Sequence, residues 1–355
     1  MVDSELAARI RAALGTIEVP GGGTLADYPG LSEIIVTQSA VAFAIAVEPG
    51  MQAAFGPARE AAEAAAGQTA GGRKVMVSLT ADRAPATASQ SARTGPVRQP
   101  VPGIRKIVVV GSGKGGVGKS TVAANLALAF SAEGLSVGLL DADLYGPSVP
   151  RILGLDGRPA MREDGIFTPH TAYGIKAMSI GAMLEPGQAV VWRGPMASAA
   201  LRQLLRETAW GELDVLVVDL PPGTGDIHIS LFQQTPVAGA VIVSTPQELA
   251  LIDARKAIDM IRRLDVPILG VVENMSHFIA PDTGNRYDIF GHGGARDAAR
   301  ELGLDFLGEI PLVMPMREAA DAGRPTVATD PEGPEAQALR MMARAILEKL
   351  GSPKA

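Results

Sequence analysis

The amino-acid sequence predicts an α/β fold, a mostly parallel sheet covered by helices, preceded by a small α+β domain. From residue 104 onward, apolar runs alternate with segments of helical periodicity. Residues 82–103 are rich in Pro, Ala, Ser and Thr without an apolar period, which is typical of a flexible linker. The first 81 residues follow the order helix, strand, strand, helix, strand. We therefore expect a small domain over residues 1–81, a linker over 82–103 and a larger domain over 104–355.

The bulk composition limits the classes of protein to consider. A chain of 355 residues with 47% hydrophobic residues is long enough for about two domains. Its formal net charge of −6 argues against a nucleic-acid partner, because such proteins are usually basic. No apolar stretch reaches the roughly 18 residues of a membrane span, and residues 1–15 do not resemble a secretory signal. We expect a cytoplasmic protein that binds neither membrane nor nucleic acid.

In the first domain, Leu6, Ile10, Ala13 and Leu14 lie at helical spacing and predict an amphipathic helix. Turn residues separate two apolar, strand-like segments, and an alanine-rich segment precedes a third. The predicted strands cover residues 31–36, 41–47 and 74–79, and the second predicted helix covers 53–66.

In the larger domain, apolar segments predict strands over residues 106–111, 136–141, 175–180, 213–219, 239–244, 268–273 and 306–309. Helical patterns between them cover residues 196–207, 247–264 and 294–302. Such alternation is typical of a parallel sheet, whose ligands bind at the carboxyl ends of the strands. Candidate functional residues are therefore expected just after strands.

A glycine-rich loop follows the first of these strands. Residues 113–120, GKGGVGKS, match the phosphate-binding pattern G-x-x-x-x-G-K-S and precede a helical pattern. Glycines let backbone N–H groups curl around phosphate oxygens, and the helix N-terminus adds its positive dipole end. We expect Lys119 to reach the β and γ phosphates and the Ser120 hydroxyl to ligate Mg²⁺. The expected nucleotide-binding residues here are Gly113, Lys114, Gly115, Gly116, Val117, Gly118, Lys119, Ser120 and Thr121.

Lys114 is a second lysine in this loop, where one already suffices to hold the phosphates. Two interpretations are open from the sequence. Lys114 is either a solvated charge, or it reaches the phosphates of a facing subunit. A cation supplied in trans can accelerate phosphoryl transfer by roughly 10³ to 10⁵.

Three aspartates follow predicted strands: Asp141 and Asp143 after one, and Asp219 at the end of another. A carboxylate near Mg²⁺ and a second that orients the attacking water would suit hydrolysis. The apolar run before Asp219 is typical of a Walker B strand, whose aspartate reaches Mg²⁺. The alternative for the first two is a pair of turn-forming aspartates.

These motifs resemble a known family. GKGGVGKS is similar to the deviant Walker A loop of the P-loop NTPases that include MinD, ParA and the nitrogenase iron protein. The run PPGTGD, residues 221–226, resembles the Mrp/ApbC iron–sulfur cluster carriers, and the first domain resembles the MIP18-type domain often fused before them. The resemblance implies an ATP- and Mg²⁺-dependent hydrolase that closes as a homodimer, with Asn274 reading adenine. The implied catalytic residues are Lys114, Lys119 and Asp143, and the implied metal ligands are Ser120, Asp141 and Asp219.

The stretch after the adenine-reading asparagine departs from the family. Members usually carry a C-P-x-C cluster site there, but Ala280 and Thr283 occupy these positions, in what we expect to be a shaped loop. The chain has no cysteine, so the family's iron–sulfur cluster would find no thiolate ligand on it. His277, Asp282 and His292 are nearby candidates for weak metal binding, although loop histidines are more often not ligands.

The leading functional hypothesis is a dimeric ATPase that resets a partner-binding surface in iron–sulfur assembly, with assembly or client proteins as partners. The alternative is a ParA- or MinD-like positioning switch. Surface binding by such a switch would need a basic amphipathic helix or basic patch, whereas residues 335–350 have an apolar face typical of core packing. A nucleotide-holding scaffold without turnover is disfavoured by the aspartates.

Overall fold

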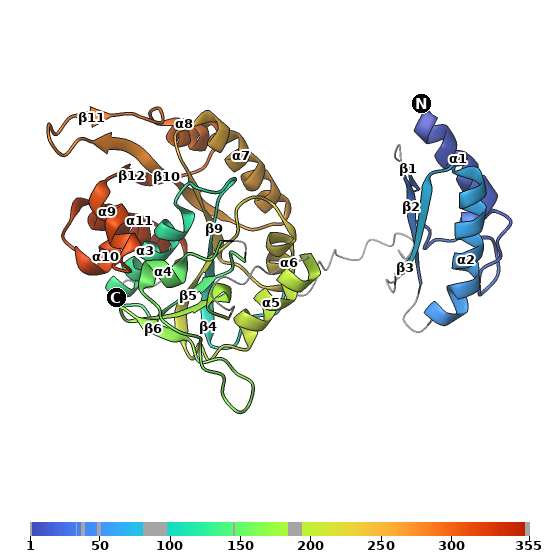
Figure 1. The fold of residues 1–355 in the computed structure, drawn as a ribbon, viewed down its shortest axis with the longest axis horizontal. Helices are drawn as coiled ribbons and strands as arrows, with labels where there is room; N and C mark the ends of the chain where they lie inside the picture. The colour runs from blue at the N-terminus through green and yellow to red at the C-terminus, as the bar shows by residue number, and fades with distance from the viewer. Residues whose placement is uncertain are drawn as a thin grey trace. The chain divides into compact units, whose positions relative to one another are not determined.

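The computed structural model describes residues 2–32, 34–36, 40–47, 51–80, 98–144, 146–183 and 194–351. The chain divides into two compact units, Met1–Arg93 and Thr94–Ala355. Figure 1 shows the first unit in blue, and the second from cyan to red. Most of the predicted linker lies outside the described residues.

In its described residues, the first unit is a two-layer α+β fold, with one sheet covered by two α-helices. α1 (Val2–Leu14) and α2 (Gln52–Thr69) pack on a sheet of β1 (Ile35–Val36), β2 (Ala40–Ala46) and β3 (Lys74–Thr80), with the short helix η1 (Leu25–Asp27) beside them. Ile10 and Leu14 of α1 are fully buried with Ile45 of β2, as the helical spacing predicts. The first predicted strand is shorter than expected, because Leu31 contributes only an isolated bridge to Ile45.

The second unit is built on a mostly parallel sheet. In its described residues, nine strands are joined in the order β11-β10-β9-β4-β8-β5-β7-β6, with β12 also paired to β10. β6 and β11 run antiparallel to their neighbours. The strands are β4 (Ile104–Gly111), β5 (Val137–Asp141), β6 (His170–Ala172), β7 (Ile175–Ser179), β8 (Leu213–Asp219), β9 (Gly239–Ser244), β10 (Ile268–Ile279), β11 (Arg286–Tyr287) and β12 (Phe306–Leu312).

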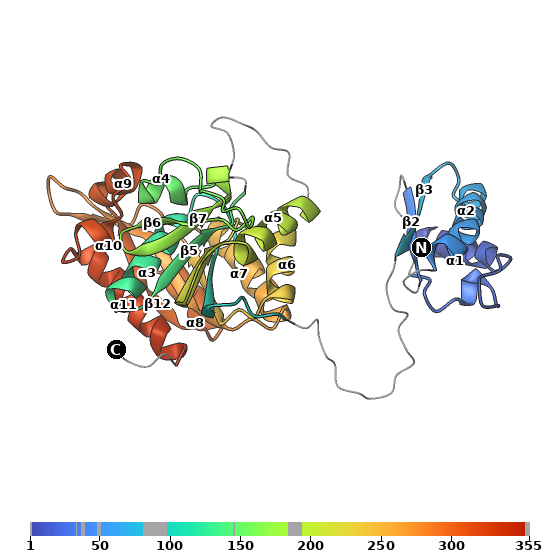
Figure 2. The same cartoon turned by 90° about the horizontal axis from the view of Figure 1, so that it is seen from below.

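Helices cover both faces of this sheet (Figures 1 and 2). One face carries α3 (Lys119–Ala132) and α11 (Pro334–Lys349), with α4 (Val149–Leu153), α9 (Met314–Asp321) and α10 (Thr326–Thr329). The other carries α5 (Gly194–Arg206), α6 (Asp226–Gln234), α7 (Glu248–Arg263) and α8 (Gly294–Glu301); η2 (Ile180–Met183) follows β7. Because both faces are covered, Val108, Val109 and Val110 of β4 are fully buried.

The last helix packs as its apolar face predicts. Leu339, Met342, Ala343 and Ile346 of α11 are buried in the core they share with α3. Across the described residues, every helix is too short or too polar to pass through a bilayer.

β10 is longer than the predicted strand, which ended at Glu273. It continues to Ile279 and turns back into β11, with Phe278 paired to Tyr287. Met275 takes a left-handed φ of 54°, within the stretch where the register to β12 shifts. The segment that we predicted as a shaped loop is therefore a β-hairpin.

The end of the predicted linker packs on the second unit. Val101 is buried in its core, and Gln99 N donates to Gln234 O at 2.9 Å. Arg98 Nη2 donates to Leu264 O at 2.6 Å. The polar composition of the segment did not predict this packing. Two of the contacts are hydrogen bonds to backbone oxygens of residues far along the chain, which composition does not indicate.

Candidate nucleotide-binding site

The glycine-rich loop joins β4 to α3 at the carboxyl edge of the sheet. Gly116 and Gly118 have φ values of 81° and 79°, in the left-handed region that favours glycine. A Cβ atom on Gly113 would lie 2.1 Å from the carbonyl carbon of Asp253 in α7, and one on Gly118 would lie 2.1 Å from Asn274 Nδ2. Glycines at these two positions let the loop pack closely between α7 and β10.

A cavity of about 430 Å³ lies over the loop. Its lining residues come from the loop, from the segment after β5 and from the segment after β8. They are Ser112, Lys114, Gly115, Gly116, Gly118, Lys119, Ser120, Thr121, Asp143, Gly146, Ser148, Ile152 and Pro222. Most of the residues predicted to contact phosphate therefore surround one cavity.

Lys119 is the buried cation of this cavity, with 6% of its surface exposed. Its Nζ lies 2.6 Å from Asp219 Oδ1, 3.5 Å from Asp143 Oδ2 and 3.3 Å from Ser120 Oγ. Strand pairing of Val110 with Asp219 sets this geometry, because the loop begins two residues after the end of β4 and the aspartate ends β8. The structure thus brings together the predicted lysine, serine and two of the predicted aspartates.

Asp219 has one carboxylate oxygen without a partner. Asp219 is fully buried, and its Oδ2 makes no hydrogen bond in the described residues, while Oδ1 accepts from Lys119. Burial raises the pKa of Asp219 above its ordinary value, and Lys119 opposes this effect. A buried carboxylate oxygen beside a serine hydroxyl is the kind of hard oxygen ligand that Mg²⁺ prefers. The side chains present therefore fit a Mg²⁺ ion.

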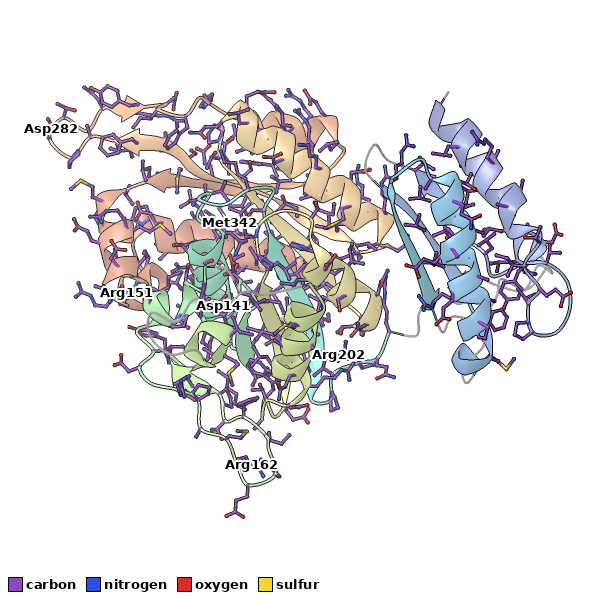
Figure 3. All side chains as sticks on the ribbon, turned by 45° about the vertical axis from the view of Figure 1, so that its right-hand side comes forward. Asp141, Arg151, Arg162, Arg202, Asp282 and Met342 are labelled. Carbon is purple, nitrogen blue, oxygen red and sulfur yellow. The ribbon has the colours of Figure 1, made fainter. Side chains whose placement is uncertain are left out.

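Asp141 holds the loop that carries Asp143. Its Oδ1 accepts from Asp143 N at 3.1 Å, and its Oδ2 accepts from Val149 N at 3.2 Å and Ser179 Oγ at 2.9 Å. Burial and then the charge of Asp219 raise the pKa of Asp141 to about 7. Figure 3 shows Asp141 inside the second unit. Both of its oxygens are already hydrogen-bonded, unlike those of Asp219.

A second cavity, of about 260 Å³, adjoins the first and shares Gly118 and Thr121 with it. Asn274, 6% exposed, lines this cavity and donates from Nδ2 to Val117 O at 2.9 Å, and among the described residues no hydrogen bond to its Oδ1 occurs. The opposite wall comes from the end of β12 and from α9. The lining residues are Gly118, Thr121, Asn274, Met275, Pro311, Leu312, Val313, Met316, Arg317, Ala320 and Asp321.

Lys114 lines the first cavity and is half-buried. Lys114 forms no ion pair within the described ranges, whereas Lys119 is paired with Asp143 and Asp219. Ser112 Oγ donates to Lys114 O at 3.0 Å, so the backbone is fixed.

The hairpin positions that correspond to the family's cysteines do not form a metal site. Ala280 is buried and Thr283 is exposed, and Ala280 N donates to Asn285 O at 2.9 Å. His277 Nδ1 bonds Ser276 Oγ, and His292 Nδ1 bonds Arg286 Nη2, both at 2.9 Å. Among the described residues, which include this whole hairpin, no three potential ligands gather around a metal position. Asp282 lies at the hairpin tip, far from Asp141 (Figure 3).

Several residues near the site were missed by the sequence reasoning. Ser179 and Ser148 come from segments with no motif, and Met316 and Arg317 line the second cavity from a helix that we did not predict. His228, in α6, is buried close to the site. Ser179, Met316 and Arg317 lie far along the chain from the motifs, so local spacing could not identify them, whereas Ser148 and His228 lie near a motif but match no pattern of their own.

Because a strand, a glycine-rich loop and a helix here present a lysine and a serine to carboxylates at neighbouring strand ends, the second unit is a P-loop NTPase. The family model described as the NUBPL iron-transfer P-loop NTPase matches residues 103–347, and the chain belongs to that family. A second model, described as iron-sulfur cluster assembly protein, matches residues 7–79. These matches confirm the resemblance to the iron–sulfur cluster carriers and the presence of the small N-terminal domain.

Individual relatives agree with the family. An iron-sulfur cluster carrier protein of Deinococcus radiodurans is 56% identical over 247 residues, 69% of this chain and 70% of that protein. The mouse iron-sulfur cluster transfer protein NUBPL is 49% identical over 72% of this chain and 81% of its own length. These relatives support the carrier-family interpretation over the positioning switch.

Solved structures support the fold. A nucleotide-binding protein of Archaeoglobus fulgidus, in complex with ADP, is 40% identical with a TM-score of 0.57, over 66% of this chain and 91% of that one. The MinD cell division ATPase of Pyrococcus furiosus, 23% identical with a TM-score of 0.53 over 69% of this chain and 99% of its own, shares the fold.

Proposed function

We propose that this chain binds MgATP as a homodimer, hydrolyses it to ADP and phosphate, and uses that cycle in iron–sulfur cluster assembly. One observation carries the proposal: the buried Lys119 faces Asp219 and Asp143 within a cavity bounded by a phosphate-binding loop. A scaffold without turnover would need Asp219 for Mg²⁺ but would not need Asp143, the carboxylate that would orient the attacking water.

The nucleotide would span both cavities. The triphosphate would lie on the amides of residues 113–120, at the N-terminus of α3, with Lys119 against the β and γ phosphates. The base would enter the second cavity, where Asn274 Oδ1 would accept a hydrogen bond from the adenine amino group. Shared lining by Gly118 and Thr121 supports one continuous ligand.

Hydrolysis would proceed by in-line attack of water on the γ phosphorus, breaking the bond to the β-phosphate oxygen. Asp143 would orient the water, and Lys119 would neutralise charge on the transferring oxygens. Asp219 and Ser120 would hold Mg²⁺, which would supply positive charge to stabilise the transferring phosphate. Asp141 would act on the magnesium side by fixing the backbone of Asp143.

Lys114 supports the dimeric part of the proposal. It lines the phosphate cavity, its side chain is only half-buried, and it forms no ion pair among the described residues. In a dimer closed over the nucleotide, Lys114 of each subunit would reach the partner's triphosphate. That arrangement would make turnover depend on association.

The cluster would be cargo held by other proteins. Relatives are named iron-sulfur cluster carriers, but this chain has no cysteine, and its hairpin positions Ala280 and Thr283 carry no thiolate. A partner with its own cluster or thiols would therefore supply the ligands, and ATP turnover would control its docking.

The test is phosphate release from ATP by the purified full chain. Turnover with Mg²⁺, loss of turnover with a chelator and a doubling of mass with a non-hydrolysable analogue are expected. If the chain hydrolyses ATP but stays monomeric without nucleotide, with ADP and with the analogue, the proposed dimer would be contradicted. ATP-dependent sedimentation with liposomes or DNA would instead favour a positioning switch.

A further inference from the structure

His228 is a buried polar side chain to which the proposed reaction gives no role. It lies in the first turn of α6 and is 2% exposed. Its Nδ1 has no hydrogen-bond partner in the part of the chain that the structure describes. The ring meets Phe232 edge-on, with centroids 6.4 Å apart. A buried imidazole with an unpaired nitrogen needs an explanation, because buried polar groups are usually hydrogen-bonded.

The ring faces the loop that joins β8 to α6. His228 is hydrogen-bonded to the backbone of Gly225 and Pro221. The charges of Lys119 and Asp143 also lie close enough to affect its pKa. Burial is the largest effect and lowers the pKa of His228 to about 4, so the ring is neutral near pH 7. A neutral imidazole has one N–H donor, and Nε2 is the nitrogen left to bond the loop.

This loop, residues 220–225, forms one wall of the phosphate cavity. Pro222 lines the cavity, and Gly223 N donates to Ser112 O at 2.9 Å, at the start of the phosphate-binding loop. The same loop follows Asp219 directly along the chain. A small movement of its backbone would displace Pro222 from the cavity wall and disturb the hydrogen bond from Gly223 N to Ser112 O.

We infer that His228 is a positioning residue: its N–H fixes the backbone of loop 220–225 so that this wall is correctly placed around the transferring phosphoryl group. The inference rests on the proposed ATP hydrolysis. It assigns His228 no contact with nucleotide. Binding of ADP depends on residues 113–120, so its affinity is expected to be independent of the His228 ring.

The inference predicts that replacing His228 lowers the rate of ATP turnover and leaves nucleotide affinity nearly unchanged. Misplacement of a reacting geometry by about 1 Å can cost up to 10²-fold in rate. Replacing His228 by leucine keeps the volume but removes the donor, so kcat is expected to fall at least about tenfold. The KM for ATP and the Kd for ADP are expected to stay within about twofold.

The experiment compares full-length His228→Leu, His228→Gln and His228→Asn with the unmodified chain. Glutamine can place an N–H near the position of Nε2, and asparagine cannot reach as far, so glutamine is expected to recover most of kcat and asparagine little. His170→Leu is the matched control, because His170 also has a buried nitrogen, Nε2, without a partner in the described residues, but it lies in β6, an edge strand three places from β8.

Unchanged kcat in His228→Leu, or equal losses in the glutamine and asparagine variants, would overturn the inference and leave the ATPase standing. If His228→Leu does not fold, the glutamine and asparagine variants decide alone. Absence of turnover in the unmodified chain, with ADP still bound, would instead remove the proposed function and the inference with it.

Discussion

Lys119 Nζ lies 2.6 Å from Asp219 Oδ1, and both side chains are almost completely buried. The contact joins the phosphate-binding loop after β4 to the end of the adjacent β8. A buried charge is costly unless it is paired, so each residue fixes the other. The lysine is thereby held at the cavity before any nucleotide arrives, which reduces the ordering cost of binding.

Lys114→Ala tests the second lysine of the phosphate-binding loop. We expect ATP affinity to stay within about threefold, while kcat falls by roughly 10³, because a cation supplied in trans acts on the transition state. Phosphate release and nucleotide binding would be measured on the same preparation. Undiminished hydrolysis by this variant would show that Lys114 is a solvated charge.

Asn274→Ala tests the second cavity. The change removes the acceptor expected for adenine and leaves Val117 O without its donor, which costs about 1–3 kcal/mol. We expect roughly tenfold weaker ATP binding and a smaller preference for ATP over GTP. Asn285→Ala, at the exposed hairpin turn, is the matched control. Equal effects of the two changes would argue against the base assignment.

Glu133 provides a pH-dependent test of the packing between α3 and α11. Arg344 and Arg340 hold the pKa of Glu133 below its ordinary value. A lowered pKa stabilises the fold above about pH 4.5, and this contribution is lost as the pH falls through the lower folded value. Glu133→Gln should therefore lower the urea midpoint at pH 7, and the difference from the unmodified chain should shrink toward pH 3. A constant difference across this range would contradict the ion pairs.

Anaerobic reconstitution with iron and sulfide tests the cysteine-free hairpin. We expect far less than one cluster per dimer after desalting, because Ala280 and Thr283 supply no thiolate. Iron and sulfide analysis with visible absorption would measure it. A stoichiometric cluster on the purified chain would show that ligands other than cysteine suffice.

Local patterns predicted much of the fold and the centre of the site. The spacing in residues 113–120 is self-contained, and the apolar face of α11 packs as its periodicity indicates. The hairpin was not predicted because polar Ser276 and His277 end the apolar run that indicates a strand. The left-handed backbone of Met275, where the strand is irregular, has no signal in the sequence. The bond from Ser179 to Asp141 joins residues 38 positions apart, which no local pattern encodes.

The most direct test of the central claim is calorimetric titration of the purified chain with ATP and Mg²⁺, alongside Lys119→Ala. The unmodified chain should bind one ATP per subunit, and the variant should bind at least 100-fold more weakly, since it lacks the cation that faces the phosphates (about 2.7 kcal/mol). Because the change also leaves Asp219 unpaired, the fold of the variant would be checked by circular dichroism. Equal affinity of a folded Lys119→Ala variant, or no binding by the unmodified chain, would contradict the account.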